Sequence, residues 1–322
     1  MCTHSIKVLK VSLKGTWNKT NLLGGSLMKA MFIYNPSSGK ADAEQYKETT
    51  INVLEGLGYE VIIKETSKQH DATLFAAQAC AEEVEFLLAM GGDGTINEVV
   101  NGLAEQPYRP LFSFIPLGTV NDFARALGIP LEPELAIEAL KMTHTELVDI
   151  GQIGDKYFMN IVAIGEIASR VADTTVEQKT KIGSLAYLLE GAKAVISSEE
   201  IEMTITHDQG IWKGTPMLIL VALTNSVGGF EKMVNTAEVN DGKLHIYIIK
   251  QAGLTSIARM GAKILLGTLE EDDGVEVIES SNVLIESENP LYCNVDGDEG
   301  ECTPLKIHIL PKHLKMLIPQ KN

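Results

Sequence analysis

Short apolar segments alternate with helix-like stretches from residue 28 to about residue 142, and this alternation constrains the fold more than any other feature. The apolar segments lie at 30–34, 59–64, 84–90 and 111–115, each short enough for a buried parallel strand. Helical patterns lie between and after them, at 41–57, 70–82, 95–105, 119–127 and 134–142. Such strand–helix–strand units predict a doubly wound parallel α/β sheet that binds ligands at the carboxyl ends of its strands.

The second half of the chain is dominated by strand patterns. Strand-like runs lie at 146–153, 157–164, 201–206, 217–224, 244–250, 282–287, 305–310 and 314–318. Helical patterns interrupt them at 183–197 and 254–266. We therefore predict an α/β domain over 28–143 and a mostly antiparallel β-sandwich domain over 144–322. In an alternative arrangement the last strand packs back on the first domain.

Composition excludes several classes of protein. The 322 residues are 45% hydrophobic and 22% charged, which is typical of a packed globular chain of about two domains. Lys and Arg number 27 against 43 Asp and Glu, and a net charge of −16 argues against general nucleic-acid binding. The longest aliphatic stretches, such as 217–223, are far shorter than the ~20 residues that span a bilayer. Four scattered cysteines predict neither a disulfide framework nor a zinc site, so the expected location is the cytoplasm.

The first 27 residues differ from the rest of the chain. Four lysines alternate there with isolated apolar residues, and no signal-peptide pattern follows. A strand pattern begins directly after Met28, and Gly24-Gly25 can be encoded by a ribosome-binding sequence. We therefore expect Met28 to be the natural start, with 1–27 as a leader. The alternatives are a disordered extension or an extra strand.

The strongest chemical signal is a glycine-rich segment, GGDGTINEVVNG, that follows the apolar run 84–90 and opens a helix. Its glycines let backbone N–H groups approach a ligand closely, and a helix N-terminus attracts anions, so the segment predicts a phosphate site. Neither GxGxxG nor GK[ST] is present, which argues against a Rossmann dehydrogenase or a P-loop. Asp93 is unfavourable beside an anion unless a cation or a transferred proton is involved. The alternative is a tight turn with Asp93 as a helix cap.

Two further loops repeat this design at neighbouring strand ends. Pro116–Arg125 places Gly118, Thr119, Asn121 and Asp122 at a strand-to-helix junction, and Asn35–Lys40 follows the first strand with small, turn-forming residues. Because the carboxyl ends of parallel strands meet at one edge of a sheet, the three loops predict one phosphate-binding surface.

Together the motifs NPSSGK, GGDGTINEVVNG and PLGTVNDFARALGIP, in this order, resemble the diacylglycerol kinase catalytic domain in its soluble bacterial form. Sphingosine and ceramide kinases share that domain, and the GGDGT loop alone is similar to one in NAD kinases and phosphofructokinases. Downstream, TNSVGGF (224–230), AEVNDGKL (237–244) and NVDGD (294–298) resemble the second-domain motifs of the lipid kinases. The resemblance covers essentially all of 29–319.

The resemblance implies sites for ATP and for magnesium. It implies that ATP contacts Asn35, Pro36, Ser37, Ser38, Gly39, Thr66, Gly91, Gly92, Asp93, Gly94, Thr95, Asn97, Glu98, Gly118, Thr119 and Asn121. Asp122 would join an acidic, water-mediated magnesium network. A structural Mg²⁺ would bind the carboxylate of Asp241 and the backbone carbonyls of Glu238 and Lys243, and oxygen ligands suit such a hard cation. From the residues alone, Asp241-Gly242 is equally compatible with a plain hairpin turn.

Phosphoryl transfer needs charge neutralisation, positioning and a carboxylate that accepts the proton of the attacking hydroxyl. Asp93, Asp296 and Asp298 are the predicted catalytic residues. Asp296 is the first candidate for the base. Since the family commonly has Glu where Asp298 stands, one methylene longer, the base can be either carboxylate.

These features predict an ATP- and Mg²⁺-dependent kinase that phosphorylates a lipid hydroxyl at the membrane interface, with diacylglycerol converted to phosphatidic acid. Other acceptors are phosphatidylglycerol, a sphingoid base or a long-chain alcohol. A kinase with a soluble acceptor such as NAD is a weaker alternative, and a non-catalytic binding protein is another. We expect a peripheral enzyme without a nucleic-acid partner, and a homodimer is compatible with the resemblance.

Overall fold

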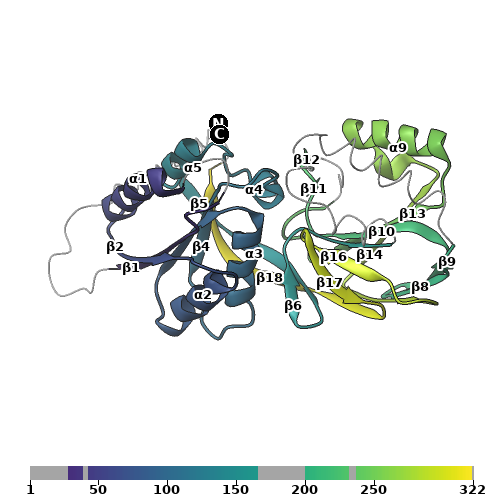
Figure 1. The fold of residues 1–322 in the computed structure, drawn as a ribbon, viewed down its shortest axis with the longest axis horizontal. Helices are drawn as coiled ribbons and strands as arrows, with labels where there is room; N and C mark the ends of the chain where they lie inside the picture. The colour runs from purple at the N-terminus through teal and green to yellow at the C-terminus, as the bar shows by residue number, and fades with distance from the viewer. Residues whose placement is uncertain (1–27, 39–42, 166–199, 232–236, 321–322) are drawn as a thin grey trace, which may run out of the picture.

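The computed structural model describes residues 28–38, 43–165, 200–231 and 237–320. These residues form two halves that lie side by side, an α/β half and a β-rich half (Figure 1). The predicted leader 1–27 and the predicted helix 183–197 lie outside the described residues. Among the described residues, no helix is long and apolar enough to cross a membrane.

The α/β half is built on a parallel sheet with strand order β2-β1-β3-β4. Strands β1 and β3 are almost wholly buried because helices cover both faces of the sheet. Helices α1 and α5 pack together on one face, and α2 and α3 pack together on the other (Figure 1). The predicted doubly wound α/β fold is confirmed. Its elements are β1 (Met28–Tyr34), α1 (Ala43–Gly56), β2 (Tyr59–Glu65), α2 (Asp71–Ala81), β3 (Phe86–Gly91), α3 (Asp93–Leu103), β4 (Leu111–Pro116), α4 (Asp122–Leu127) and α5 (Pro133–Ala139).

Two long strands, β5 (Thr143–Ile153) and β18 (Leu305–Pro319), connect the halves. Strand β18 pairs with β4 in parallel at Met316↔Phe112 and with β5 in antiparallel orientation along its length. Its other end pairs with β15, so one sheet runs from β2 in the first half to β9 in the second. The sequence predicts two strands at 305–310 and 314–318. They form one strand with a register shift between Leu310 and Leu314.

The β-rich half stacks a second, antiparallel sheet, with strand order β14-β13-β10-β7-β16-β17, against the far end of the first sheet. Val221, Ile246 and Ile285 are among the buried residues that fill the space between them, which confirms the predicted β-sandwich. Helix α9 packs on the outer face of the second sheet. The remaining elements are β6 (Lys156–Phe158), β7 (Ile161–Ile164), β8 (Met203–His207), β9 (Gly210–Gly214), β10 (Pro216–Ala222), β11 (Ser226–Val227), β12 (Phe230–Glu231), β13 (Leu244–Lys250), α9 (Leu254–Leu266), the short 3₁₀ helix η1 (Leu269–Glu271), β14 (Val275–Ser280), β15 (Asn282–Ser287), β16 (Tyr292–Val295) and β17 (Asp298–Cys302).

One predicted strand is interrupted. The run 157–164 is divided by a bend at Met159 and Asn160 into β6 and β7. The bend turns the backbone N–H groups of these two residues away from strand pairing and toward a carboxylate in the site described next.

Candidate active site

A polar cavity of about 450 Å³ opens at the carboxyl ends of β1, β2 and β3. Eight of the residues predicted to contact nucleotide line it: Asn35, Ser37, Ser38, Thr66, Gly92, Gly94, Thr95 and Glu98. Predicted residues that do not line it are Pro36, Gly91, Asp93, Asn97, Gly118, Thr119 and Asn121. Gly39 lies outside the described residues.

The N-terminus of α3 faces this cavity without a side-chain cap. Gly92 is the N-cap residue and makes no side-chain cap hydrogen bond, so N–H groups of the first turn remain available to an anion. The loop after β1 closes on this turn, because Asn35 Nδ2 donates to Thr95 Oγ1 at 3.3 Å. Gly92 N also donates to Ser38 Oγ at 3.4 Å. The arrangement therefore suits a phosphate group.

Asp93 lies behind this turn and joins it to the loop after β4. Its carboxylate accepts a hydrogen bond from Asn121 N at 2.9 Å. Burial raises the pKa of Asp93, and this hydrogen bond opposes the rise. The two loops pack so closely that a Cβ on Gly118 would lie 3.0 Å from Asp93 Oδ2 and 3.2 Å from Gly92 Cα. The β4–α4 loop thus braces the phosphate-binding turn from behind.

The loop between β2 and α2 forms another wall of the cavity, through Ser67, Lys68 and Gln69. Asp71 fixes this loop by accepting hydrogen bonds from Ser67 N and Lys68 N at 2.8 and 3.0 Å. Glu98, from α3, accepts hydrogen bonds from the backbone at the start of α2. Sequence reasoning missed Ser67, Lys68, Gln69 and Ala72. Their position directly after a predicted strand end is the signal that indicates them.

Asp122 bonds to the opposite half of the molecule. Its carboxylate accepts hydrogen bonds from Ser226 Oγ at 2.7 Å, Gly228 N at 2.7 Å and Gly229 N at 2.9 Å. Ser226 belongs to β11, and Gly228 and Gly229 form the turn between β11 and β12, so Asp122 fixes α4 to the β-rich half.

Asp296 makes a second link between the halves. With Gly297 it forms the two-residue turn between β16 and β17, and both residues have positive φ. Its carboxylate accepts four hydrogen bonds, from the backbone N–H of Met159, Asn160 and Ile161 at 2.8–3.0 Å and from Asn97 Nδ2 of α3 at 3.0 Å. Burial raises the pKa of Asp296 to about 6, although these hydrogen bonds lower it.

Asp298 begins β17 and is exposed, directly beyond this turn. It pairs with Val295 across the hairpin. The hairpin therefore carries one enclosed carboxylate and one accessible carboxylate, two residues apart.

Comparison with known proteins places this geometry in a family. Residues 29–153 match the family described as Diacylglycerol kinase catalytic domain, and 160–318 match the YegS C-terminal NAD kinase beta sandwich-like domain. A diacylglycerol kinase of Bacillus subtilis (strain 168) is 37% identical over 297 residues, which cover 92% of this chain and 98% of the relative. The chain belongs to the diacylglycerol kinase family. This confirms the resemblance and the predicted enzyme class, an ATP-dependent lipid kinase.

Other members of the diacylglycerol kinase family agree. The diacylglycerol kinase of Staphylococcus epidermidis (strain ATCC 12228 / FDA PCI 1200) is 36% identical, over 91% of this chain and 92% of its own length. A crystal structure of a putative diacylglycerol kinase from Bacillus anthracis str. Sterne superposes with a TM-score of 0.79 at 28% identity, covering 92% of this chain and 99% of that one.

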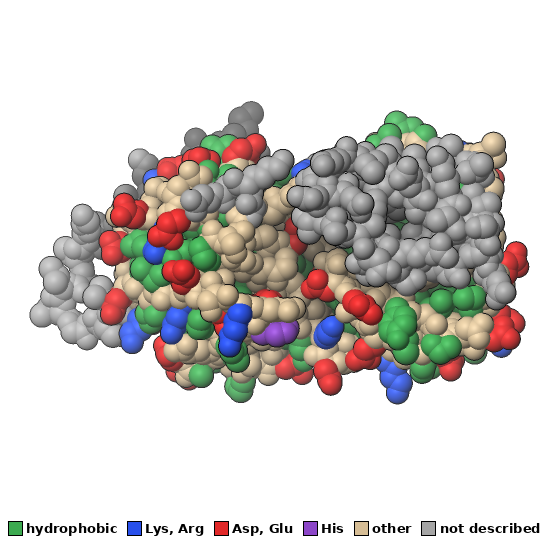
Figure 2. Space-filling model, viewed as in Figure 1, with side chains coloured by type: hydrophobic (Ala, Val, Ile, Leu, Met, Phe, Trp, Pro, Cys, Tyr) green, Lys and Arg blue, Asp and Glu red, His purple; other side chains and the backbone are tan. Residues whose placement is uncertain are grey.

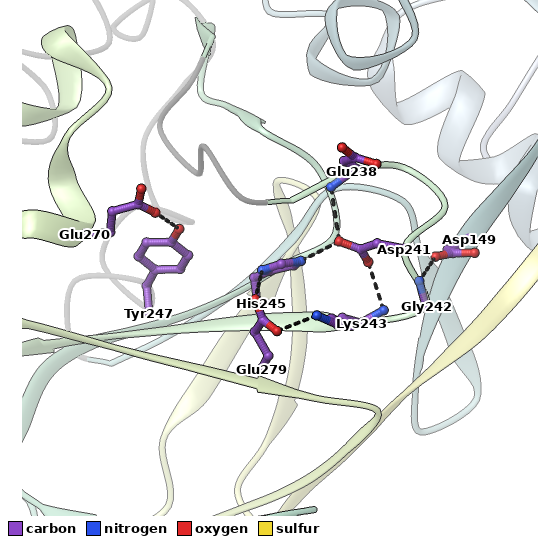
Figure 3. A network of polar contacts seen from close by, with 9 residues as sticks. All are labelled: Asp149, Glu238, Asp241, Gly242, Lys243, His245, Tyr247, Glu270 and Glu279. Atoms are coloured by element: carbon purple, nitrogen blue, oxygen red, sulfur yellow. Dashed lines mark hydrogen bonds and ion pairs between the residues drawn. The ribbon is translucent and has the colours of Figure 1, made fainter.

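The predicted cation site of this diacylglycerol kinase family member lies on the turn before β13 (Figure 3). The Asp241 carboxylate accepts hydrogen bonds from Lys243 N at 2.9 Å and Glu238 N at 3.2 Å, and it bonds to the buried His245 at 2.8 Å. Burial acts to raise the pKa of Asp241, but the hydrogen bonds outweigh it and lower the pKa. Asp149 bonds to Gly242 N at 2.7 Å from the other side.

A cation on this turn would compete with existing hydrogen bonds, because both carboxylate oxygens of Asp241 already accept N–H groups and the Glu238 carbonyl accepts from Asp241 N. Carboxylate and backbone carbonyl oxygens are the ligands that Mg²⁺ and Ca²⁺ prefer. Burial raises the pKa of Asp149, and the charge of Asp241 raises it further, so a cation here would offset the repulsion between two carboxylates. Within the described residues, no cluster of three or more His, Cys, Asp or Glu side chains forms a metal site made of side chains alone.

Proposed function

We propose that the protein transfers the γ-phosphate of ATP to the free hydroxyl of diacylglycerol, giving phosphatidic acid. The observation that carries this proposal is the position of α3. Its uncapped N-terminus faces the polar cavity, and Asn97, one turn further along, touches the hairpin that bears Asp296 and Asp298. A phosphate site and a carboxylate hairpin on one helix suit phosphoryl transfer.

We propose that residues 28–143 hold the nucleotide and that 144–322 supply the acceptor side. The phosphates of ATP would lie against the backbone N–H groups of Gly94 and Thr95. Mg²⁺ bound with ATP would supply charge neutralisation, and Asp93 is the carboxylate beside the phosphate turn that would hold it, with Asp122 in the surrounding acidic network. A second Mg²⁺ would be held by Asp241 and the carbonyls of Glu238 and Lys243, with a structural role.

We propose Asp298 as the general base. A carboxylate has about four acceptor positions, and those of Asp296 are occupied by four N–H donors. Asp298 is exposed and can accept a proton from an incoming hydroxyl. Asp296 then positions the hairpin, and Asp298 performs the proton transfer.

Substitution separates these two roles. Asp298→Asn should lower kcat by about 100-fold or more while leaving the melting temperature unchanged, since the side chain is exposed. Asp296→Asn should lower both kcat and the melting temperature, because an amide nitrogen then faces backbone N–H donors. Turnover close to that of the wild type in Asp298→Asn would contradict the assignment of the base.

The remaining part of the proposal concerns the acceptor lipid and the place where the enzyme meets it. We propose a cytoplasmic enzyme that contacts the bilayer transiently, alone or as a homodimer. On the face seen in Figure 2, the Lys and Arg side chains of the described residues are scattered among more numerous acidic ones. Phosphatidylglycerol, a sphingoid base or a long-chain alcohol would bring its hydroxyl to the same hairpin.

Radiolabelled ATP tests the activity directly. The purified protein is incubated with γ-labelled ATP, Mg²⁺ and mixed micelles that contain diacylglycerol, phosphatidylglycerol, ceramide, sphingosine or undecaprenol, with NAD in a parallel tube. We expect label in diacylglycerol. Label in another lipid alone would replace the acceptor, and label in NAD alone would overturn the lipid-kinase proposal.

A further inference from the structure

Asn97 was predicted from sequence to contact ATP, but its side chain is bonded elsewhere. It does not line the nucleotide cavity, whereas its neighbours Thr95 and Glu98 do. Its amide nitrogen donates to Asp296 Oδ2 at 3.0 Å, across the boundary between the two halves. The side chain thus points from the nucleotide helix α3 toward the catalytic hairpin.

Asn101, one turn further along α3, holds this contact in place. Its side-chain amide pairs with both backbone polar groups of Tyr157 in β6: Nδ2 donates to Tyr157 O at 2.9 Å, and Oδ1 accepts from Tyr157 N at 3.0 Å. The same Nδ2 also lies within hydrogen-bond distance of two oxygens of Asn97, the backbone O at 2.9 Å and Oδ1 at 3.0 Å. Because Oδ1 of Asn97 faces this donor group and an ionised Asp296 carboxylate can only accept, the nitrogen of the Asn97 amide is the atom that faces Asp296.

The Asp296 carboxylate is held from the other side by three consecutive backbone N–H groups. Residues 159–161, at the bend between β6 and β7, donate to both of its oxygens. Successive N–H groups that converge in this way form an anion-binding concavity. Asp296 is therefore bound like an anion between this bend and α3.

From these contacts we infer that Asn97 and Asn101 are positioning residues. They fix the β16–β17 hairpin, and with it Asp298, relative to the phosphate turn at the start of the same helix. Asn97 lies four residues after Asp93, so a displacement of the hairpin along α3 would change the distance between the base and the transferred phosphate. The kinetic part of this inference rests on the proposed phosphoryl transfer.

The test compares Asn97→Ala and Asn101→Ala with a matched control, Thr73→Ala. Thr73 Oγ1 donates to the Glu98 carbonyl of α3 at 2.9 Å, so the control also removes one side-chain hydrogen bond to this helix, but on the side facing α2. All variants are assayed well below their melting temperatures. The kcat and the KM for ATP are measured on the lipid that the wild type phosphorylates.

We expect both Asn variants to lower kcat at least tenfold with the KM for ATP within twofold of the wild type, and Thr73→Ala to leave both within twofold. A raised KM for ATP with an unchanged kcat in Asn97→Ala would overturn the inference and return Asn97 to the nucleotide site. An equal loss of kcat in the control would also overturn it, since the effect would then follow from any loosening of α3.

Hydrogen exchange gives a readout that does not need activity. Protection of the amides of Met159, Asn160 and Ile161, and of the hairpin 292–302, should fall in both Asn variants and stay unchanged in Thr73→Ala. Unchanged protection in the Asn variants would overturn the inference even in an active enzyme. If the wild type transfers phosphate to no acceptor, the proposed function fails. Hydrogen exchange alone then still decides whether Asn97 and Asn101 fix the β16–β17 hairpin to α3.

Discussion

At the scale of single residues, the carboxylates of the site have distinct environments. Asp93 and Asp296 are enclosed, and burial raises the pKa of each. Burying a carboxylate costs stability unless hydrogen-bond donors compensate, and the backbone N–H groups of Asn121, Asp122 and Asp93 itself bond to the Asp93 carboxylate. The pKa of Asp93 is raised all the same, so burial outweighs these hydrogen bonds, and this favours a chemical role for Asp93 over a stabilising one.

Asp93→Ala should therefore abolish transfer, with kcat reduced by at least about 100-fold, while the melting temperature stays the same or rises. Thermal unfolding and the kinase assay on one preparation measure both. A fall in melting temperature that parallels the loss of activity would show instead that Asp93 is structural.

The pH dependence of kcat reports on Asp296. Its pKa is about 6 in the folded protein against an ordinary value of 3.8, so the folded state binds a proton more readily between these values. The contribution of this group to the free energy of unfolding therefore falls as the pH rises through that window, and acid does not unfold the protein through it. Protonation nevertheless places a hydrogen where four N–H donors point.

We expect kcat to decline as the pH falls below about 6 while thermal unfolding shows an intact fold. The measurement is kcat from pH 5 to 8 on the labelled lipid, with melting temperatures at each pH. A constant kcat down to pH 5 would show that an ionised Asp296 is not required.

At the scale of elements, the sequence pattern predicted well the elements that pack against segments close to them in the chain. Helix α9 spans Leu254–Leu266, the predicted range 254–266, because Ile257, Met260 and Ile264 recur at helical spacing and face one sheet. The division of 157–164 into β6 and β7 has no local signal, because its cause, the Asp296 carboxylate, lies far along the chain. The strands that were not predicted are β9, β11, β12, β14, β16 and β17. Strands β9, β14 and β17 lie at sheet edges, where burial imposes less pattern, whereas β16 is a short strand between β7 and β17.

Helix α9 is anchored by charge as well as by apolar packing. Buried Asp272 accepts two hydrogen bonds from Arg259, from Nε at 2.7 Å and Nη2 at 2.9 Å. Arg259 holds the pKa of Asp272 well below its usual range, so the stabilisation is present above the ordinary pKa of 3.8 and is lost as the pH falls through the lower folded value.

Asp272→Asn should lower the free energy of unfolding by about 2 kcal/mol at pH 7, the usual loss for hydrogen bonds to a charged group. Denaturant titration at pH 7 measures it, with exposed Asp273→Asn as the control. An equal loss of unfolding free energy in Asp272→Asn and Asp273→Asn would show that Asp272 is not a specific anchor of α9.

At the scale of the whole molecule, the sequence predicted two domains with a boundary near 143, and the nucleotide loops follow that division. The sheet does not follow this division, because β18, from the end of the second half of the chain, pairs with β4 of the first. Phe112 and Phe114 of β4 are buried in the core of the α/β half, which also includes Leu314 and Met316 of β18. Parallel pairing between segments so far apart leaves no trace in local composition, and so the packing of the last strand on the first domain was predicted only as an alternative arrangement, which is the one the structure has.

A fragment of residues 28–143 should therefore not fold alone, since it lacks both β5 and β18 and leaves the edge of β4 open. We expect it to aggregate, or to show little cooperative unfolding by circular dichroism. The fragment 28–322 is the control. A monomeric, cooperatively folded 28–143 fragment would establish that this half is an independent domain.

The position of β18 also bears on how the protein is made. Residues 305–319 are synthesised long after β4, yet they occupy a place inside the sheet rather than at its edge. During translation the edge of β4 in the α/β half therefore stays unpaired until β18 has been made, and chains with an unpaired strand edge associate with one another. We expect chaperones that shield nascent chains to matter more for this protein than its moderate size suggests.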